Sequence, residues 1–235
     1  MCLNGTLDCL LQNGRAAGVS RFLVHSVAIS ADRVEHINTF LMQAAARHPQ
    51  ELVGFGSLHP NYADLPRELE RMRKGGLRGV KLHPDFQKFL LDDAKAIEMF
   101  RAMADAGMPA LVHTGDKRYE YSQPERMARV LDKAPKLKVI CAHLGGWSVW
   151  TQAWHALAGR PNLWVDTSSS LYAIHADEAA EVIRRYGADR VFFGTDYPMW
   201  RPKDEIDRVL ALPLTPEERE KIFHLNFEAF LRGLD

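Results

Sequence analysis

The stretch PALVHTGD, residues 109–116, shows the pattern that decides the fold. An apolar run ends in a histidine, and a Gly-Asp turn follows it. Strands that are buried on both faces of a parallel sheet have this nearly continuous apolar character. The polar side chain at the carboxyl end of the run marks a position where parallel-sheet enzymes place their chemistry.

The same pattern recurs along the whole chain. Apolar runs predict seven strands, at residues 20–28, 52–58, 77–83, 109–114, 138–144, 162–167 and 190–196. Helical spacing of apolar residues predicts helices at residues 6–17, 31–47, 64–74, 92–105, 122–134, 178–186 and from 215 toward 232. Two capping boxes are expected, Ser122 with Glu125 and Thr215 with Glu218.

This alternation of strands and helices predicts an α/β fold with a parallel sheet. An open doubly wound sheet usually carries a glycine-rich phosphate loop after its first strand. The sequence has no G-x-x-x-x-G-K-[ST], and Gly54-Phe-Gly56 lies inside a predicted strand. We therefore predict a (β/α)8 TIM barrel, as one domain over residues 1–235, with seven strands because the first strand is missing.

The composition narrows the functional classes. Hydrophobic residues make up 46% of the 235 residues, which suits a folded core. The 30 basic and 30 acidic side chains give a formal net charge of zero, so neither a nucleic acid nor a membrane is expected as partner. No apolar stretch approaches the roughly 20 residues of a membrane span, and no signal-peptide pattern is visible. Three cysteines without a C-x-x-C pair predict a reducing, cytoplasmic compartment.

Polar side chains recur at the ends of the predicted strands, where a barrel enzyme has its active site. They are His59, Lys81, His83, His113, His143, Asp166, Ser168 and Asp196. Imidazole and carboxylate groups are the usual protein ligands of zinc and related divalent ions. We expect His113, His143 and Asp196, from three different strands, to converge on one divalent metal ion, with zinc as the first choice.

Each of these residues also has a structural alternative. A strand-end histidine can be a hydrogen-bonded residue of the framework, and Asp196 can stabilise the turn that it opens. Asp166 and the serines at 168–170 are expected to bind turn backbone. His25, in the middle of a predicted strand, is expected to pack inside or face a helix.

Four short motifs resemble a known family. They are GVKLHP at 79–84, LVHTGD at 111–116, CAHLGG at 141–146 and FGTDYP at 193–198. In this order they resemble the amidohydrolase-related metal-dependent hydrolases, a group that includes enzymes like aminocarboxymuconate-semialdehyde decarboxylase. The resemblance implies that His113 and Asp196 bind the metal and that Asp196 takes the proton of the attacking water. It implies that His143 binds metal or polarises the substrate.

One departure from the family pattern concerns the metal ligands. The first strand of the family ends in a His-x-His pair, and this sequence has no such pair. Either the chain lacks N-terminal residues of a longer barrel, or the barrel is not catalytic. A barrel without its first strand has two unpaired edges, which are expected to be covered by N-terminal residues or to pair in a homo-oligomer.

The expected activity is hydrolysis of an amide, lactone or ester bond in a small molecule by metal-activated water. An alternative on the same site is non-oxidative decarboxylation of a small aromatic or unsaturated carboxylic acid. A third is a barrel retained without catalysis. The substrate is expected to contact side chains near the strand ends, namely Lys81, His83, Asp116, Trp147 and Tyr197. Lys81 has a salt bridge or a metal-bridging carbamate as alternative roles, and Trp147 has packing on the barrel.

Overall fold

The computed structural model describes residues 3–234, and its centre is one sheet of seven parallel strands. The strands lie side by side in chain order, with at least one helical segment between consecutive strands. They are β1 (Phe22–His25), β2 (Leu52–Ser57), β3 (Gly79–Leu82), β4 (Ala110–Val112), β5 (Val139–Cys141), β6 (Leu163–Asp166) and β7 (Val191–Phe192). This topology is that of a (β/α) barrel, and the predicted fold class is confirmed.

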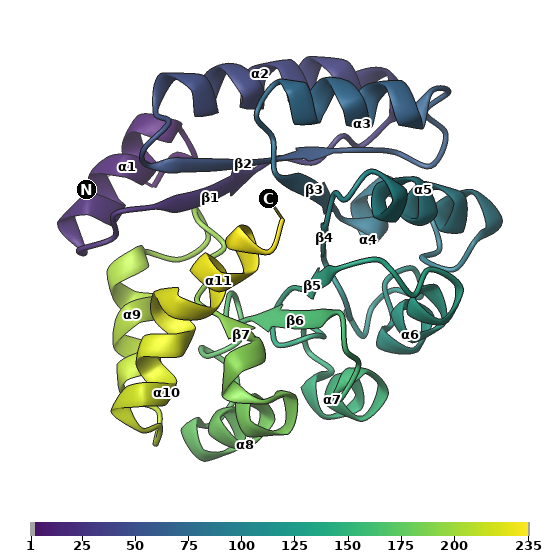
Figure 1. Ribbon diagram of the computed structural model, residues 1–235. Helices are drawn as coiled ribbons and strands as arrows, with labels where there is room; N and C mark the ends of the chain where they lie inside the picture. Colours follow the sequence, from purple (N-terminus) through teal and green to yellow (C-terminus); the bar gives the residue numbers. More distant parts are fainter. Residues whose placement is uncertain (1–2, 235) are drawn as a thin grey trace.

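The sheet curls into an open barrel whose helices lie mainly on the outside (Figure 1). The helices are α1 (Leu7–Ala16), α2 (Val34–Arg47), α3 (Leu65–Lys74), α4 (Pro84–Gln87), α5 (Ala94–Asp105), α6 (Pro124–Lys133), α7 (Trp150–Leu157), α8 (Ala176–Tyr186), α9 (Pro202–Leu210), α10 (Pro216–Glu220) and α11 (Asn226–Arg232). The apolar helix faces and the outward-facing strand residues together form the largest hydrophobic cluster. No helix among residues 3–234 is long and apolar enough to cross a membrane.

The strands end earlier than the sequence predicted. The run predicted at 138–144 is cut to β5 because the backbone turns left-handed at His143 and Leu144, with φ of 62° and 51°. The run predicted at 190–196 is cut to β7, and Asp196 is also left-handed, with φ of 52°. His143 and Asp196 therefore lie in the loops that follow the strands, whereas Lys81 and Asp166 lie within β3 and β6.

One of the two predicted helix caps is wrong. Helix α6 begins at Pro124, and Gln123 stands at its N-cap position without a side-chain bond. The hydroxyl of Ser122 instead lies 2.7 Å from both a carboxylate oxygen of Asp85 and the carbonyl oxygen of Gly115. The capping box of Thr215 and Glu218 is confirmed at α10. The helix predicted from 215 onward is divided, because a π-helical segment, Lys221–Leu225, separates α10 from α11.

Glycines inside β2 allow a close approach of helices to the sheet. A Cβ atom on Gly56 would lie 2.4 Å from the side chain of Met72 and 2.6 Å from that of Asn38. One on Gly54 would lie 2.6 Å from the side chain of Leu77. These distances are shorter than van der Waals contact, so a larger residue at either position would displace the packed side chains. The Gly54-Phe-Gly56 sequence therefore serves packing, as its position inside a predicted strand indicated.

The inside of the barrel has its own hydrophobic cluster, which α11 completes. Inward-facing residues of six strands take part, among them Phe55 of β2 and Phe192 of β7. Phe230 of α11 packs edge-on against Phe192, with ring centroids 5.5 Å apart, and against Trp164 of β6, at 4.9 Å. Figure 1 shows α11 crossing the inside of the curved sheet. The C-terminal helix thus fills the interior with side chains.

The two terminal strands of the sheet, β1 and β7, do not pair with each other among residues 3–234. Helix α1 packs on β1 through an apolar cluster that includes Leu11 and Phe22, and it also contacts α9, which follows β7. This arrangement agrees with the expectation that N-terminal residues cover the unpaired edges. The expected homo-oligomer stays a prediction.

We expect Phe230→Ala to lower the free energy of unfolding by about 3–5 kcal/mol, because it empties a buried aromatic site inside the barrel. Urea unfolding followed by circular dichroism measures the change. Phe40→Ala is the matched control, since Phe40 on α2 is 52% exposed and its removal should cost less than about 0.5 kcal/mol. Equal effects of the two substitutions would contradict the role given to α11.

Candidate functional site

His113 and His143 lie in direct contact just beyond the ends of β4 and β5. Nδ1 of His113 is 3.0 Å from Nε2 of His143, and the two ring centroids are 4.9 Å apart. Both residues are buried. Burial lowers the pKa of each imidazole, most strongly at His113, so both rings are neutral at neutral pH. Neutral imidazole is the form that binds metal ions.

The loop after β6 holds His143 in place. The carbonyl oxygen of Ser168 lies 2.9 Å from Nδ1 of His143, and the Ser168 hydroxyl lies 3.0 Å from the same atom. Asp166 accepts hydrogen bonds from the Ser168 hydroxyl and from the backbone N–H groups of Ser168 and His143. The expectation of binding to turn backbone is therefore confirmed for Asp166 and for Ser170, whose hydroxyl donates to the carbonyl oxygen of Ser168, whereas the Ser168 hydroxyl binds side chains.

Asp196 is held by the same loop. It accepts a 2.6 Å hydrogen bond from the Ser169 hydroxyl, which in turn accepts one of 2.9 Å from the indole N–H of Trp200. Burial alone would raise the pKa of Asp196. His143, Ser169 and Lys81 together outweigh burial, so the pKa of Asp196 is lowered and the carboxylate is charged. Its left-handed backbone, which costs free energy in a non-glycine residue, is typical of functional positions.

Lys81 brings a buried cation to the inside of the barrel. The residue is 5% exposed and lies on β3. Burial lowers the pKa of its ammonium group, and the negative charges of Asp166 and Asp196 oppose that shift. His25, the last residue of β1, lies close enough to be influenced by Lys81, Asp196 and His143. Burial of the ring and the positive charge of Lys81 lower the pKa of His25 to about 3, although the residue as a whole is exposed.

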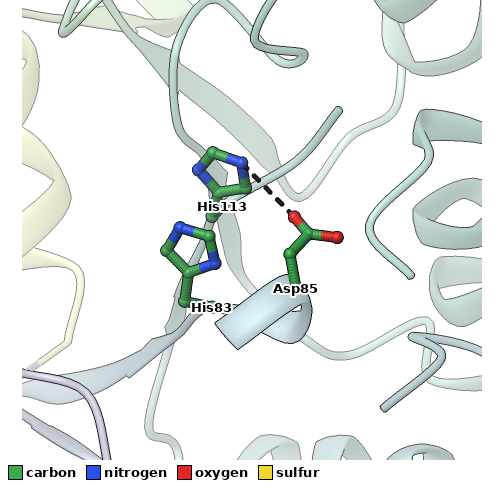
Figure 2. Close-up of side chains that lie close together, drawn as sticks. All are labelled: His83, Asp85 and His113. Atoms are coloured by element: carbon green, nitrogen blue, oxygen red, sulfur yellow. Dashed lines mark ion pairs between the residues drawn. The ribbon is translucent and has the colours of Figure 1, made fainter. Parts of the chain in front are cut away.

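A second group of possible metal ligands lies on the other side of His113. One ligand atom each from His83, Asp85 and His113 lies within 4.8 Å of the others. Nε2 of His113 is 3.5 Å from Oδ2 of Asp85 (Figure 2). The rings of His83 and His113 are stacked, with centroids 3.9 Å apart and planes 9° apart. Three buried atoms of this group have no hydrogen-bond partner: Nδ1 of His83, Oδ1 of Asp85 and Nε2 of His113.

The predicted metal ligands are thus brought together only in part. His113 and His143 touch, and Asp196 influences His143 electrostatically. Among residues 3–234, however, the side chains whose ligand atoms lie close enough together to hold one metal ion are His83, Asp85 and His113. His83 was expected to contact substrate, and Asp85 was not expected to take part. The unpartnered, buried atoms of this group suit a divalent cation, because each can supply a lone pair.

The remaining predicted substrate contacts lie around this centre. Asp116 is buried and takes hydrogen bonds of 2.9 Å and 2.7 Å from the guanidinium of Arg118, which also lies 5.0 Å from the ring of Trp147. Trp147 lies in the loop before α7, which begins at Trp150. Burial raises the pKa of Tyr197, and a hydrogen bond with Asn13 of α1 opposes this shift. Of the strand-end histidines, His59 stands apart, because its ring contacts backbone at Gln87 and Asn61.

Sequence reasoning missed three residues of this centre. His25 was placed in mid-strand because the predicted strand ran to residue 28, whereas β1 ends at His25. Asp85 lies in α4, a helix too short to show a periodic pattern. The only available signal was its place two residues after the strand-end His83. Ser169 was expected to bind backbone, and it binds the carboxylate of Asp196 instead.

Histidines, carboxylates and a buried lysine gathered at the carboxyl ends of the strands of an open parallel barrel are typical of metal-dependent (β/α)-barrel enzymes. Residues 9–233 match the sequence model of the family described as Amidohydrolase. The chain therefore belongs to the amidohydrolase family, as the four motifs indicated.

Solved structures with the same fold include an uncharacterized TIM-barrel protein from Bordetella bronchiseptica, 26% identical, with a TM-score of 0.82 over 97% of this chain and 83% of that one. A 5-carboxyvanillate decarboxylase from Sphingomonas paucimobilis is 18% identical, with a TM-score of 0.76 and coverage of 94% and 82%. A dihydroxybenzoic acid decarboxylase from Polaromonas sp. JS666, with bound manganese and the inhibitor 2-nitroresorcinol, is 18% identical, with a TM-score of 0.74 and coverage of 97% and 86%.

We expect Asp85→Asn to stabilise the metal-free protein more at neutral than at acidic pH. Burial raises the pKa of folded Asp85 from 3.8 to about 6, so wild-type stability falls as the pH rises between these values. Asparagine does not ionise. The difference in unfolding free energy between variant and wild type should therefore grow by about 2 kcal/mol between about pH 4.5 and about pH 7.5. Urea unfolding in the presence of a chelator measures it.

Asp116→Asn is the control for this titration. Burial alone would raise the pKa of Asp116, but hydrogen bonds from Arg118 outweigh it and lower the pKa. The stability that this carboxylate contributes is therefore already present at the acidic end of the range. The Asp116→Asn difference should stay nearly constant, and a growing difference in both variants would refute the assignment to Asp85.

Proposed function

We propose that the protein catalyses metal-dependent, non-oxidative decarboxylation of a small aromatic acid that carries a hydroxyl group on its ring. In this reaction the bond between the ring and the carboxylate breaks, and carbon dioxide leaves. The electron pair of that bond stays on the ring carbon, which then takes up one proton. No oxidant or reductant is needed.

The observation that carries this proposal is the buried position of Lys81. Its ammonium group lies inside the barrel near the charged Asp196, and it forms no ion pair among residues 3–234. A buried cation favours an anionic partner, so a substrate carboxylate is the natural ligand for Lys81. Aromatic rings around the mouth, including the stacked pair Tyr172 and Trp200 at 4.6 Å, suit a flat aromatic substrate.

The solved structures of similar fold also support decarboxylation over hydrolysis. The two whose activities are named act on carboxylated phenols, and one holds manganese with a nitrophenol inhibitor. Hydrolysis was the first expectation from the sequence, and it rests on the family as a whole. Decarboxylation, the alternative on the same site, has the more specific support.

A divalent cation would be held at His113, the histidine that belongs both to the set expected from the sequence and to the group found in space. When bound, such a cation stabilises negative charge on substrate oxygen atoms. Imidazole and carboxylate donors suit zinc and manganese alike, so we propose that the ion is one of these two.

The side chains of the chain itself would handle charge and proton. Lys81 would bind and orient the carboxylate that leaves. Asp196, held by Ser169 and charged, would accept a hydrogen bond from the group that protonates the ring carbon and so orient that group. Rings at the mouth would exclude water from the pocket.

Incubation of the protein, loaded with Mn²⁺ or Zn²⁺, with a panel of hydroxybenzoates tests the proposal. Carbon dioxide release is expected from at least one of them. Lys81→Met should then lower kcat/KM by about 100-fold or more, because the substrate carboxylate loses its buried partner. Lys74→Met is the matched control, since Lys74 lies on the exposed face of α3 and pairs with Glu70.

Two outcomes would overturn the proposal. Turnover of esters, lactones or amides without any release of carbon dioxide would favour hydrolysis. Absence of any turnover by a protein that binds metal would favour the non-catalytic barrel.

A further inference from the structure

We infer that Trp200 is a positioning residue for Asp196 and that it acts through the hydroxyl of Ser169. The indole N–H of Trp200 fixes the direction of that hydroxyl, and the hydroxyl holds one carboxylate oxygen of Asp196. This role rests on the proposed function, in which Asp196 orients the group that protonates the substrate ring. It is separate from any contact between Trp200 and the substrate.

The hydrogen of the Ser169 hydroxyl has one direction available. Nε1 of Trp200 lies 2.9 Å from Oγ of Ser169, and an indole nitrogen can only donate. The Trp200 N–H therefore takes a lone pair of the hydroxyl oxygen and leaves the hydroxyl hydrogen for another acceptor. Oδ2 of Asp196, 2.6 Å away, is that acceptor. Hydrogen bonds in such a chain polarise one another, so the indole strengthens the bond that holds the carboxylate.

The hydrogen bond between Ser169 and Asp196 joins two strained positions. The backbone angle φ is 46° at Ser169 and 52° at Asp196, in the left-handed region that favours glycine. Such a conformation costs free energy and persists only where the surroundings hold it. The two residues lie in different loops, after β6 and after β7, so the bond between their side chains holds both loops in place.

The indole of Trp200 is itself held by two further contacts. The ring of Tyr172 stacks on it, with centroids 4.6 Å apart and planes 26° apart. The guanidinium of Arg208 lies 4.7 Å from the ring, and it pairs with Glu205, a buried carboxylate on the same helix, α9. These contacts limit rotation of the indole, so its N–H stays directed at Ser169.

Tyr172 and Trp200 divide two tasks between them. Tyr172 is 42% exposed, whereas Trp200 is only partly exposed and its single polar group is occupied by Ser169. An aromatic substrate can therefore pack on Tyr172 while the N–H of Trp200 remains on Ser169. A substitution at Trp200 that keeps an aromatic ring should remove the hydrogen bond and preserve most of the packing.

Nuclear magnetic resonance of the full chain tests this role without any turnover. The side-chain carboxyl ¹³C resonance of Asp196 should move in Trp200→Phe, although the indole reaches that carboxylate only through Ser169. The indole N–H resonance of Trp200 should move in Ser169→Ala. Trp154→Phe is the matched control, since Trp154 on α7 also lies against a guanidinium, that of Arg185 at 4.9 Å, and its loss should leave the Asp196 resonance in place.

Turnover kinetics separate positioning from substrate contact. With an acid that the protein decarboxylates, Trp200→Phe and Ser169→Ala should each lower kcat by about 10-fold to 100-fold and change KM by less than about threefold. The double variant should be about as slow as the slower single variant, because both substitutions break the same chain of hydrogen bonds. Circular dichroism checks that each variant folds.

Two results would overturn the inference. One is an Asp196 carboxyl resonance that is the same in Trp200→Phe and in wild type. The other is a double variant in which the two effects on kcat/KM multiply, as expected if Trp200 acts on the substrate directly. A resonance that moves in a protein that releases no carbon dioxide from any hydroxybenzoate would support the positioning role and overturn the decarboxylase proposal.

Discussion

The hydrogen bond between His113 and His143 is the contact on which the centre of the barrel depends. Two buried, neutral imidazoles that share one hydrogen have only one consistent arrangement once the Ser168 carbonyl is included. Ser168, in the loop after β6, thus sets through His143 which ring nitrogen of His113 carries the hydrogen. Three successive loops are thus linked by hydrogen positions as well as by packing.

The charges inside the barrel are balanced within a small volume. Lys81 is buried, and the negative charges of Asp166 and Asp196 offset part of its cost of desolvation, which still lowers its pKa. Asp166 is largely occupied by hydrogen bonds with the turn around His143, so Asp196 is the freer of the two carboxylates. An anionic substrate that enters this volume meets a cation without a tight partner. The electrostatics of this volume therefore favour an anion over a neutral or cationic molecule.

The sequence was sufficient for the fold and for most of the strand-end residues. Apolar runs and their spacing identify all seven strands, and the motifs around His113 and Asp196 identify the family. Side-chain partners could not be predicted in the same way. Ser122 looked like a helix cap and binds Asp85, because a hydroxyl takes whichever acceptor the tertiary fold supplies. His25 and Asp85 escaped notice because strand ends and very short helices leave no periodic signal.

The position of α11 inside the curved sheet bears on the order of folding events. Phe230 packs on side chains of β6 and β7, and the guanidinium of Arg78 reaches the carbonyl of Leu231, 153 residues away in sequence. This docking surface does not exist until the strands that form it have assembled, so α11 can complete its contacts only on a sheet that is already curved. The last helix of the chain therefore joins parts of the barrel that are distant in sequence.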